Sequence, residues 1–199
     1  MPITSAKSTL SPFESHHLRS KVFKLIQQRS FSKGRFTLAS GVESDYYLDL
    51  KPTMLDAEGA DGLAELVLDE LYGMNVDYVG GLAVGAVSLL GGIQVLSHRK
   101  GRPIPGFYVR KEIKDHGTMK LVEGLAPGET LQGKRVVILD DVTTSGGSAM
   151  AAVKAAQNAG ATIILVLAIV DRQEGAAEFY DRADIPFKAL FTARDFLEA

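Results

Sequence analysis

Residues 135–148 read RVVILDDVTTSGGS, and this stretch predicts a strand that runs into a helix. It begins with four apolar residues, Val136 to Leu139, which are typical of a buried strand. Two adjacent acids follow, and then hydroxyl residues and glycines that open a helix. In an open parallel sheet, ligands bind beyond the carboxyl ends of the strands. Asp140 and Asp141 fall where this strand would end, so the stretch indicates a binding site.

The residues after the acids have the composition of a phosphate-binding loop. Thr143 to Ser148 can offer backbone N–H groups and hydroxyls at a helix N-terminus, and glycine lets the backbone approach an anion. Two carboxylates before such a loop would repel a phosphate unless they have other partners, and sugar hydroxyls and magnesium are candidates. The stretch therefore indicates a ligand with ribose, phosphate and metal. The alternative is a strand followed by an N-capped turn. A single helix cap does not require so many acidic, hydroxyl and glycine residues, so this alternative explains the stretch less well.

Strands and helices alternate along most of the chain. The predicted strands are 78–81, 106–109, 136–139 and 162–170, and the predicted helices are 14–28, 57–72, 85–97, 147–159 and 174–181. The strands are apolar throughout rather than at every second residue, which predicts an α/β fold with an open, mainly parallel sheet and helices on both faces. Residues 36–51 predict a hairpin around Gly41 outside this sheet.

Composition limits the classes of protein to consider. The chain has 199 residues, of which 46% are hydrophobic and 23% charged, and no boundary interrupts it, so we expect a single domain over 1–199. The absence of cysteine excludes a disulfide scaffold, a thiolate zinc site and a cysteine nucleophile. The longest strongly apolar run, Ile163 to Val170, is far shorter than the ~20 residues of a membrane helix. The first dozen residues lack the apolar segment of a secretory signal, so we expect a cytoplasmic protein.

Charge is distributed unevenly. The net charge is -2, which argues against a general nucleic-acid or membrane-surface binder. Between His98 and Lys120, however, there are seven basic residues and only two acidic ones. Such a segment suits a small anion with several charges, and a solvated basic loop is the equally weighted alternative.

Other motifs for nucleotides or catalysis fail on their residues. Residues 128–134, GETLQGK, nearly match a P-loop, but Arg135 takes the Ser/Thr position and the segment enters a strand instead of leaving one. No GxGxxG follows a predicted strand, and there is no GxSxG and no His pair at metal-ligand spacing. We expect no functional role for His16, His17 and His98.

VVILDDVTTSGGS resembles the 5-phosphoribosyl 1-diphosphate (PRPP) signature of the type I phosphoribosyltransferases. Three further segments resemble the orotate phosphoribosyltransferase branch of that family. Residues 110–117, RKEIKDHG, are similar to its catalytic loop, and 171–174, DRQE, are similar to the strand end with its orotate-binding arginine. Residues 36–44, FTLASGVES, are similar to its N-terminal hood. The resemblance implies a hood of roughly 1–55 with the C-terminal tail, and a core of roughly 56–185.

The resemblance also implies an activity and its residues. The orotate branch of the family transfers the phosphoribosyl group from PRPP to orotate in pyrimidine (UMP) biosynthesis. The resemblance implies magnesium, which would arrive with the donor and lie near Asp140 and Asp141 rather than in a tight site made by the protein alone. Thr144, Arg172 and Tyr47 would bind orotate. The residues implied in donor binding are Arg110, Lys111, Lys114, His116, Asp140, Asp141, Val142, Thr143, Thr144, Ser145, Gly146, Gly147 and Ser148.

Arg110, Lys114 and His116 are the implied catalytic residues, and Lys114 or His116 would donate a proton to diphosphate. In this family the loop of 110–117 reaches across a homodimer interface into the neighbouring site. Two positions depart from the pattern: Ala39 stands where many members have lysine, and Val84 and Gly85 stand where some have Tyr-Lys.

Three alternatives stay open at this stage. A phosphoribosyltransferase for another base would keep the central motif but would not need DRQE or RKEIKDHG. A non-catalytic regulator that senses PRPP would not need the cations of the 110–117 loop. For Arg172 itself, a salt bridge at the strand end with Asp171 or Glu174 is the alternative to orotate binding.

Overall fold

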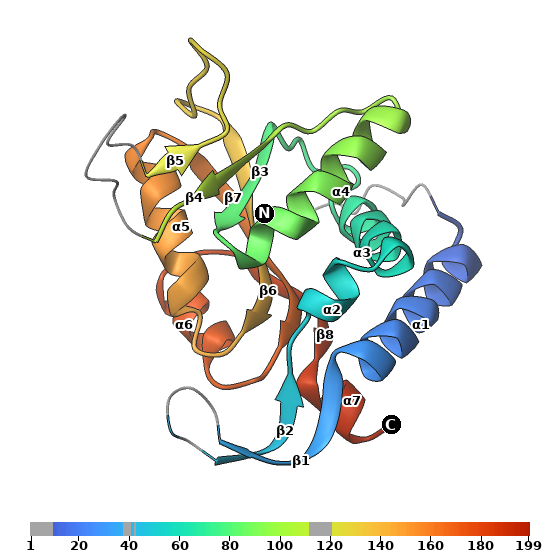
Figure 1. Ribbon diagram of the computed structural model, residues 1–199. Coiled ribbons are helices and arrows are strands. Elements are labelled where there is room, and N and C mark those ends of the chain that lie inside the picture. The colour runs from blue at the N-terminus through green and yellow to red at the C-terminus, as the bar shows by residue number, and fades with distance from the viewer. Residues whose placement is uncertain (1–9, 38–40, 42, 112–120) are drawn as a thin grey trace.

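A computed structural model describes residues 10–37, 41, 43–111 and 121–199. Its centre is a six-stranded sheet with the spatial order β5-β4-β3-β6-β7-β8, and a two-stranded sheet lies beside it (Figure 1). The strands of the large sheet are β3 (Tyr78–Leu82), β4 (Gly106–Val109), β5 (Val122–Glu123), β6 (Arg135–Thr143), β7 (Thr162–Asp171) and β8 (Phe187–Thr192). All neighbouring pairs are parallel except β4 and β5. The predicted open, mainly parallel sheet is therefore confirmed.

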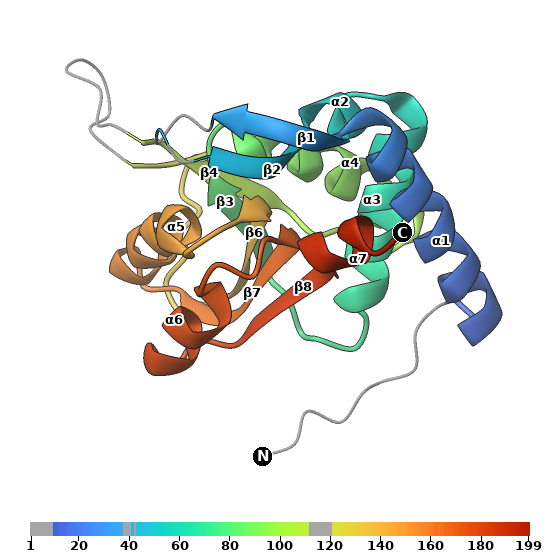
Figure 2. The same ribbon diagram turned by 90° about the horizontal axis from the view of Figure 1, so that it is seen from below.

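Helices cover both faces of this sheet (Figures 1 and 2). One layer contains α1 (Pro12–Arg29), α3 (Ala57–Glu70) and α4 (Gly85–Arg99), and the other contains α5 (Gly147–Asn158) and α6 (Ala176–Arg182). The side chains of β6 alternate between two hydrophobic clusters: Val137 and Leu139 join the α3 and α4 cluster, and Val136 and Ile138 join the α5 and α6 cluster. Burial on both faces explains why the strand is apolar at every position.

The N-terminal hairpin forms its own antiparallel sheet from β1 (Phe31–Thr37) and β2 (Glu43–Leu48), with the short α2 (Lys51–Met54) after it. A separate hairpin was expected, and it is confirmed, although β1 begins at Phe31 rather than Phe36. Alternate residues of β2 are more buried: Ser44, Tyr46 and Leu48. This alternation decides which of two adjacent tyrosines faces the core.

The C-terminal helix α7 (Ala193–Leu197) joins the hairpin to the core. Phe196 is fully buried, and its ring lies 4.5 Å from that of Phe23 on α1 and 5.6 Å from that of Phe31 on β1. The C-terminal helix therefore shares one aromatic cluster with two N-terminal elements that are distant from it in sequence. The division into a hood and a core stays a prediction.

Element boundaries differ from the sequence expectation at a few points. Strand β6 continues to Thr143, so Asp140 and Asp141 lie within the strand rather than after it. Helix α1 begins at Pro12 because Ser11 and Glu14 form a reciprocal capping box. Helix α6 begins at Ala176, after Gly175 with φ of 102°. Four elements were not expected, namely α2, β5, β8 and α7. No helix in the described part of the chain is long and apolar enough to span a membrane.

Candidate active site

Four strands end together at one edge of the large sheet. β4, β3, β6 and β7 are parallel neighbours, so their carboxyl ends lie side by side. Arg110 follows β4, the acidic pair and its loop belong to the end of β6, and Arg172 follows β7. The sequence-predicted residues within the described ranges are gathered at this edge, apart from Tyr47 on β2 of the hairpin. Open parallel sheets bind their ligands at such an edge.

The loop between β6 and α5 is held in one conformation by buried contacts. Gly146 has φ of 87°, and a Cβ at this position would lie 2.9 Å from Phe179 and 3.0 Å from Tyr180. Only glycine fits both the left-handed backbone and the close approach of α6. The buried hydroxyl of Tyr180 donates a hydrogen bond of 2.7 Å to the carbonyl oxygen of Gly146.

The same loop leaves the N-terminus of α5 free for a ligand. Among the described residues, no side chain caps this helix, so its first N–H groups are not satisfied by a cap. Thr144, Ser145 and Ser148 are exposed beside those groups. Unsatisfied N–H groups and the positive end of the helix dipole favour an anion here.

The two carboxylates differ in their surroundings. Asp140 is only 8% exposed, and neither its Oδ2 atom nor the Thr143 hydroxyl oxygen has a hydrogen-bond partner in the described part of the chain. Burial, and then the negative charge of Asp141, raise the pKa of Asp140 to about 7. Asp141 is less buried and lies against the turn after β3, where a Cβ on Gly85 would be 2.6 Å from its Oδ1.

These oxygens suit a hard cation. Carboxylate and hydroxyl oxygens are the ligands that Mg²⁺ prefers, and it is usually held by one or two carboxylates together with substrate phosphates. The orphaned Oδ2 of Asp140, beside a second carboxylate, therefore fits magnesium that arrives with a phosphorylated ligand. Within the described ranges, no group of three or more His, Asp or Glu side chains gathers into a metal site.

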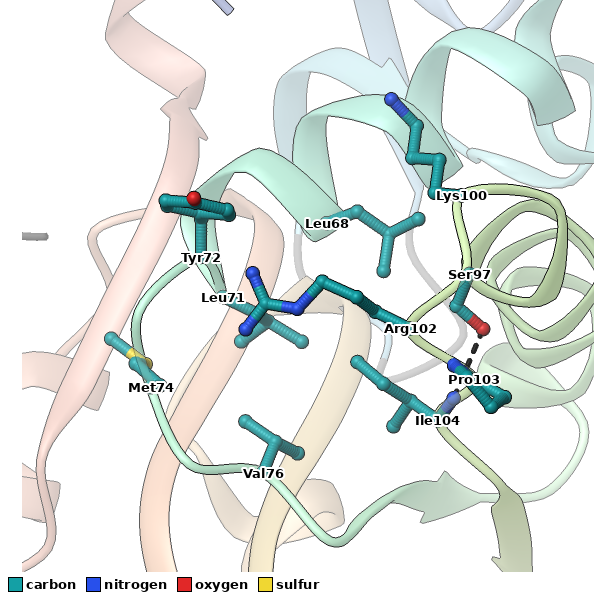
Figure 3. A pocket seen from close by; sticks show the side chains of 10 residues that line it. All are labelled: Leu68, Leu71, Tyr72, Met74, Val76, Ser97, Lys100, Arg102, Pro103 and Ile104. Atoms are coloured by element: carbon teal, nitrogen blue, oxygen red, sulfur yellow. Dashed lines mark hydrogen bonds between the residues drawn. The ribbon is translucent and has the colours of Figure 1, made fainter. Parts of the chain in front are cut away.

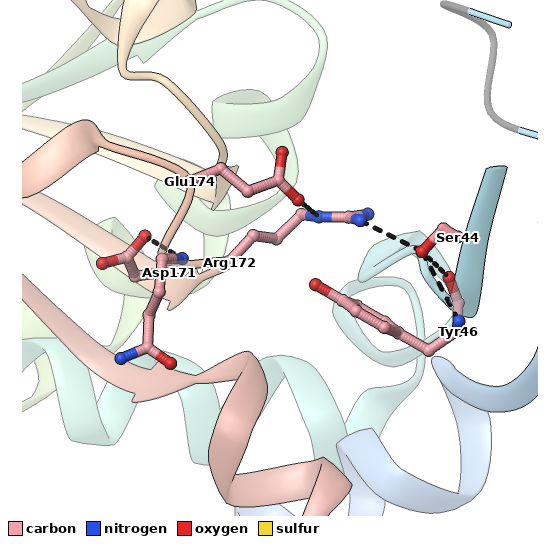
Figure 4. A network of polar contacts seen from close by, with 6 residues as sticks. Ser44, Tyr46, Asp171, Arg172 and Glu174 are labelled. Carbon is pink, nitrogen blue, oxygen red and sulfur yellow. Dashed lines mark hydrogen bonds and ion pairs between the residues drawn. The ribbon is translucent and has the colours of Figure 1, made fainter. Parts of the chain in front are cut away.

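Arg172 lies directly beside the phosphate loop. Its backbone N–H donates to the carbonyl oxygen of Thr143 at 2.9 Å. Its side chain, 8% exposed, forms an ion pair of 2.7 Å between Nε and Oε1 of Glu174 (Figure 4). The salt bridge that sequence offered as the alternative for Arg172 is thus present with Glu174. Asp171 instead accepts a hydrogen bond of 2.8 Å from the backbone N–H of Gln173.

The remaining predicted residues have less defined partners. Arg110 forms an ion pair with Glu123 at 3.3 Å, and Lys111 is exposed. Lys114 and His116 lie outside the described residues. Tyr47 is 45% exposed, with its ring 5.6 Å from that of Phe36.

A separate cavity of about 500 Å³ lies at the opposite edge of the sheet, before β3 and β4 begin (Figure 3). Its lining includes Arg102, whose guanidinium carbon lies 4.8 Å from the ring centroid of Tyr72, and Lys100. These two cations belong to the basic segment of 98–120, which β4 therefore divides between two edges. The described cations of this segment that follow β4 are Arg110 and Lys111. They lie at the same edge of the sheet as Asp140 and Asp141.

The comparisons with known proteins agree with this geometry. A family model described as the phosphoribosyl transferase domain matches residues 48–189. The orotate phosphoribosyltransferase of Bradyrhizobium diazoefficiens is 53% identical over 181 residues, which cover 91% of this chain and 97% of that protein. The chain belongs to the orotate phosphoribosyltransferase family. The family that the motifs predicted is thus confirmed.

Solved structures of this family share the fold. Orotate phosphoribosyltransferase of Mycobacterium tuberculosis in complex with Fe(III) dicitrate aligns with a TM-score of 0.78 at 34% identity, over 90% of this chain and 98% of that one. The same enzyme in complex with PRPP aligns with a TM-score of 0.74 at 31% identity, with the same coverage. The roles of individual residues in this chain stay predictions.

Sequence reasoning missed three side chains that contact the predicted site residues: Ser44, Tyr46 and Tyr180. Ser44 and Tyr46 contact Arg172, and Tyr180 supports the phosphate loop. A signal for Tyr46 existed, because strand alternation places Ser44, Tyr46 and Leu48 on one face. Nothing in the sequence around Tyr180 distinguishes it from an ordinary aromatic residue on the inner face of a helix.

Proposed function

We propose that this protein transfers the phosphoribosyl group of PRPP to N1 of orotate and releases diphosphate, the orotidine 5′-monophosphate step of UMP biosynthesis. One observation carries the proposal: Arg172 stands beside the phosphate loop, joined to it by the hydrogen bond to Thr143. A guanidinium suited to a carboxylate therefore lies next to a cradle suited to a phosphate. Orotate brings the carboxylate and PRPP brings the phosphate.

The donor's 5′-phosphate would bind at the start of α5. The N–H groups of Gly147 and Ser148 and the hydroxyls of Thr144 and Ser145 are the available donors. They supply hydrogen bonds without adding charge, and the conformation of Gly146 brings the backbone close to the anion. Val142 and Thr143 complete the end of β6 that leads into this loop.

The ribose would lie over Asp140 and Asp141. Their oxygens can accept hydrogen bonds from the ribose hydroxyls, directly or through water. Cleavage of the anomeric C–O bond places positive charge on the sugar, which two nearby carboxylates stabilise. Magnesium, when bound with the donor at these carboxylates, neutralises charge on the diphosphate.

Orotate would be held by Arg172, Thr144 and Tyr47. A guanidinium binds a carboxylate through two parallel N–H···O bonds, a geometry that lysine cannot copy. Thr144 follows Thr143, whose carbonyl oxygen accepts a hydrogen bond from the backbone N–H of Arg172, so Thr144 belongs to the segment beside Arg172. The exposed ring of Tyr47 would cover one side of the base.

The diphosphate would leave toward Arg110 and Lys111, together with Lys114 and His116 of the same loop. Negative charge grows on this group as the C–O bond breaks, and each preorganised donor contributes roughly 10²- to 10³-fold to the rate. Lys114 or His116 would supply a proton to the departing diphosphate, and N1 of orotate loses its own proton to solvent as it bonds to the anomeric carbon. Loop closure would exclude the water that hydrolyses the activated sugar.

Two of the family's cationic positions are replaced in this chain. Ala39 lies outside the described residues. Val84 is exposed and offers no charge, and Gly85 is the residue against which Asp141 lies. A side chain at 85 would displace that carboxylate, because its Cβ would come within 2.6 Å of Oδ1. We therefore expect the loop of 110–117 to supply most of the positive charge at the diphosphate.

We further propose that the protein is a cytoplasmic homodimer in which the loop of 110–117 serves the partner's site. No role in nucleic-acid or membrane-surface binding is proposed, in keeping with a net charge of -2.

An ultraviolet assay tests the function. Purified protein is mixed with magnesium and PRPP and then with orotate, uracil, adenine or hypoxanthine in separate reactions. We expect orotate to be consumed and the other bases to be left almost unchanged. Turnover of a purine instead would favour another phosphoribosyltransferase, and PRPP binding without turnover of any base would favour a regulator.

Substitution of Arg172 tests the acceptor assignment. Arg172→Lys keeps the charge but loses the two-point geometry, so the KM for orotate should rise about 10-fold or more while the KM for PRPP changes little. Initial rates with each substrate varied in turn measure this. Equal increases in both KM values would contradict the assignment.

A further inference from the structure

The guanidinium of Arg172 is held on three sides by residues for which no role has been assigned. Glu174 accepts from Nε at 2.7 Å, and the Ser44 hydroxyl oxygen lies 3.4 Å from Nη2. The ring of Tyr46 packs against the guanidinium, with 4.5 Å from its centroid to Cζ (Figure 4). Glu174 comes from the segment after β7, whereas Ser44 and Tyr46 come from β2 of the hairpin.

These contacts leave one edge of the guanidinium available. Arginine has five N–H donors, one on Nε and two on each terminal nitrogen. Glu174 takes the Nε donor and Ser44 takes one from Nη2. Within the described residues, no carboxylate forms an ion pair with the terminal nitrogens, and a carboxylate that binds in two-point geometry needs one donor from each of them.

Ser44 is oriented so that it can act only as an acceptor toward Arg172. Its hydroxyl donates a hydrogen bond of 2.8 Å to the backbone carbonyl oxygen of Tyr46. Because that bond uses the only hydroxyl hydrogen, the lone pairs of Ser44 face the guanidinium. The position of Nη2 is therefore coupled to the backbone of β2.

Tyr46 is itself supported by the core. Its ring lies 5.8 Å from that of Phe31, which in turn lies 5.6 Å from the buried ring of Phe196. The surface beneath the guanidinium thus continues through an aromatic cluster to the C-terminal helix. A cation above such a ring is attracted to its face, which fixes the plane of the guanidinium.

We propose that Ser44, Tyr46 and Glu174 are positioning residues for the acceptor, which fix the plane and the free edge of Arg172 so that it meets a carboxylate on a planar base. This inference rests on the proposed function. The side chain of Glu174 is 45% exposed, so its removal opens no cavity in the core. Its contribution is to geometry: it holds Nε and leaves the terminal edge to the substrate.

Paired variants test the proposal. In Glu174→Ala the acceptor is lost, and in Glu174→Gln an oxygen acceptor remains. In Tyr46→Leu the aromatic face is lost, and in Tyr46→Phe it remains. We expect the KM for orotate to rise about 10-fold in the first member of each pair and less than about 3-fold in the second, with the KM for PRPP unchanged in all four. Glu178→Ala is the matched control. It removes a neighbouring exposed carboxylate, and the contacts of the described residues include none between Glu178 and Arg172.

The outcomes separate this inference from the proposed function. Wild-type turnover of orotate together with unchanged KM values in Glu174→Ala and Tyr46→Leu would overturn the positioning role alone. So would equal increases in the KM for both substrates, or a Glu174→Gln variant as impaired as Glu174→Ala. No wild-type turnover of orotate would overturn the function and this inference together. Should Tyr46→Leu fail to fold, the exposed Glu174 pair decides the matter.

Discussion

Asp140 is a buried carboxyl group beside a second carboxylate, that of Asp141. Its Oδ2 has no partner within the described ranges, and its pKa is raised from 3.8 to about 7 by burial and by Asp141. The folded protein therefore binds this proton more tightly than the unfolded chain does. Between about pH 4 and pH 7 the contribution of Asp140 to the free energy of unfolding should therefore fall as pH rises, by at most about 1.4 kcal/mol per pH unit. Such a cost at a binding edge is consistent with a group that is stabilised by its ligand.

We expect Asp140→Asn to be more stable than the wild type at pH 7.5 and almost inactive. The neutral amide removes the charge that burial disfavours, so the melting temperature should rise by about 5 °C at pH 7.5 and little at pH 4.5. Turnover should fall by about 10²-fold or more, because the sugar and its metal lose a carboxylate. Thermal melts at the two pH values and initial rates measure these effects. A variant that is equally destabilised at both pH values would contradict this account of Asp140.

At the scale of elements, the phosphate loop depends on the helix that follows β7 in the chain. Gly146 opens α5, but the group that fixes its carbonyl is the hydroxyl of Tyr180 on α6. Burial raises the pKa of Tyr180, so its hydroxyl stays protonated and remains a donor at every pH at which the protein is studied. The loop is thus braced from the α5 and α6 layer rather than by its own residues.

Tyr180→Phe tests this brace. Removal of one buried donor leaves the carbonyl oxygen of Gly146 unsatisfied, so the free energy of unfolding should fall by about 1–3 kcal/mol. The KM for PRPP should rise several-fold and the KM for orotate much less, because we propose that this loop binds the 5′-phosphate of PRPP. Denaturant unfolding and initial rates measure the two effects. Loss of stability without any change in the KM for PRPP would limit Tyr180 to a role in folding.

The elements that sequence predicted are those whose pattern is local. β6 and β7 are buried on both faces, so their apolar runs are visible without any knowledge of neighbours. β8 was not predicted because it is the edge strand and its burial is uneven, and β5 has only two residues. The extra residues of β6 are polar except for Val142, and their place in the strand follows from pairing with β7 up to Thr143 and Asp171.

The site divides in the same way. The phosphate loop and Arg172 occupy contiguous motifs, and the structure places both at one edge. Arg172 contacts Ser44 and Tyr46, which lie 128 and 126 residues before it in the sequence. No local pattern predicts a contact between positions so far apart in the chain. Choosing between Tyr46 and Tyr47 for that contact requires knowing which face of β2 is inward, which becomes clear only from the buried Leu48.

At the scale of the whole molecule, the hairpin contacts the sheet edge at Arg172, while the loop of 110–117 begins farther along that edge, after β4. Arg110, at the end of β4, is separated from Arg172, at the end of β7, by the strands β3 and β6 in the sheet order. A loop that starts there can be shared with a second protomer, and a two-fold dimer would give both sites the same arrangement.

Hybrid dimers test this sharing. Lys114→Ala and the double variant Asp140→Asn, Asp141→Asn should each be nearly inactive alone. When they are co-expressed with different tags and the hybrid is purified through both, a loop that acts on its partner's site leaves one of two sites intact, so activity should recover to about half of the wild-type value. A loop that acts on its own subunit places one defect in each site, and the hybrid would stay inactive. A monomeric mass by light scattering would exclude sharing altogether.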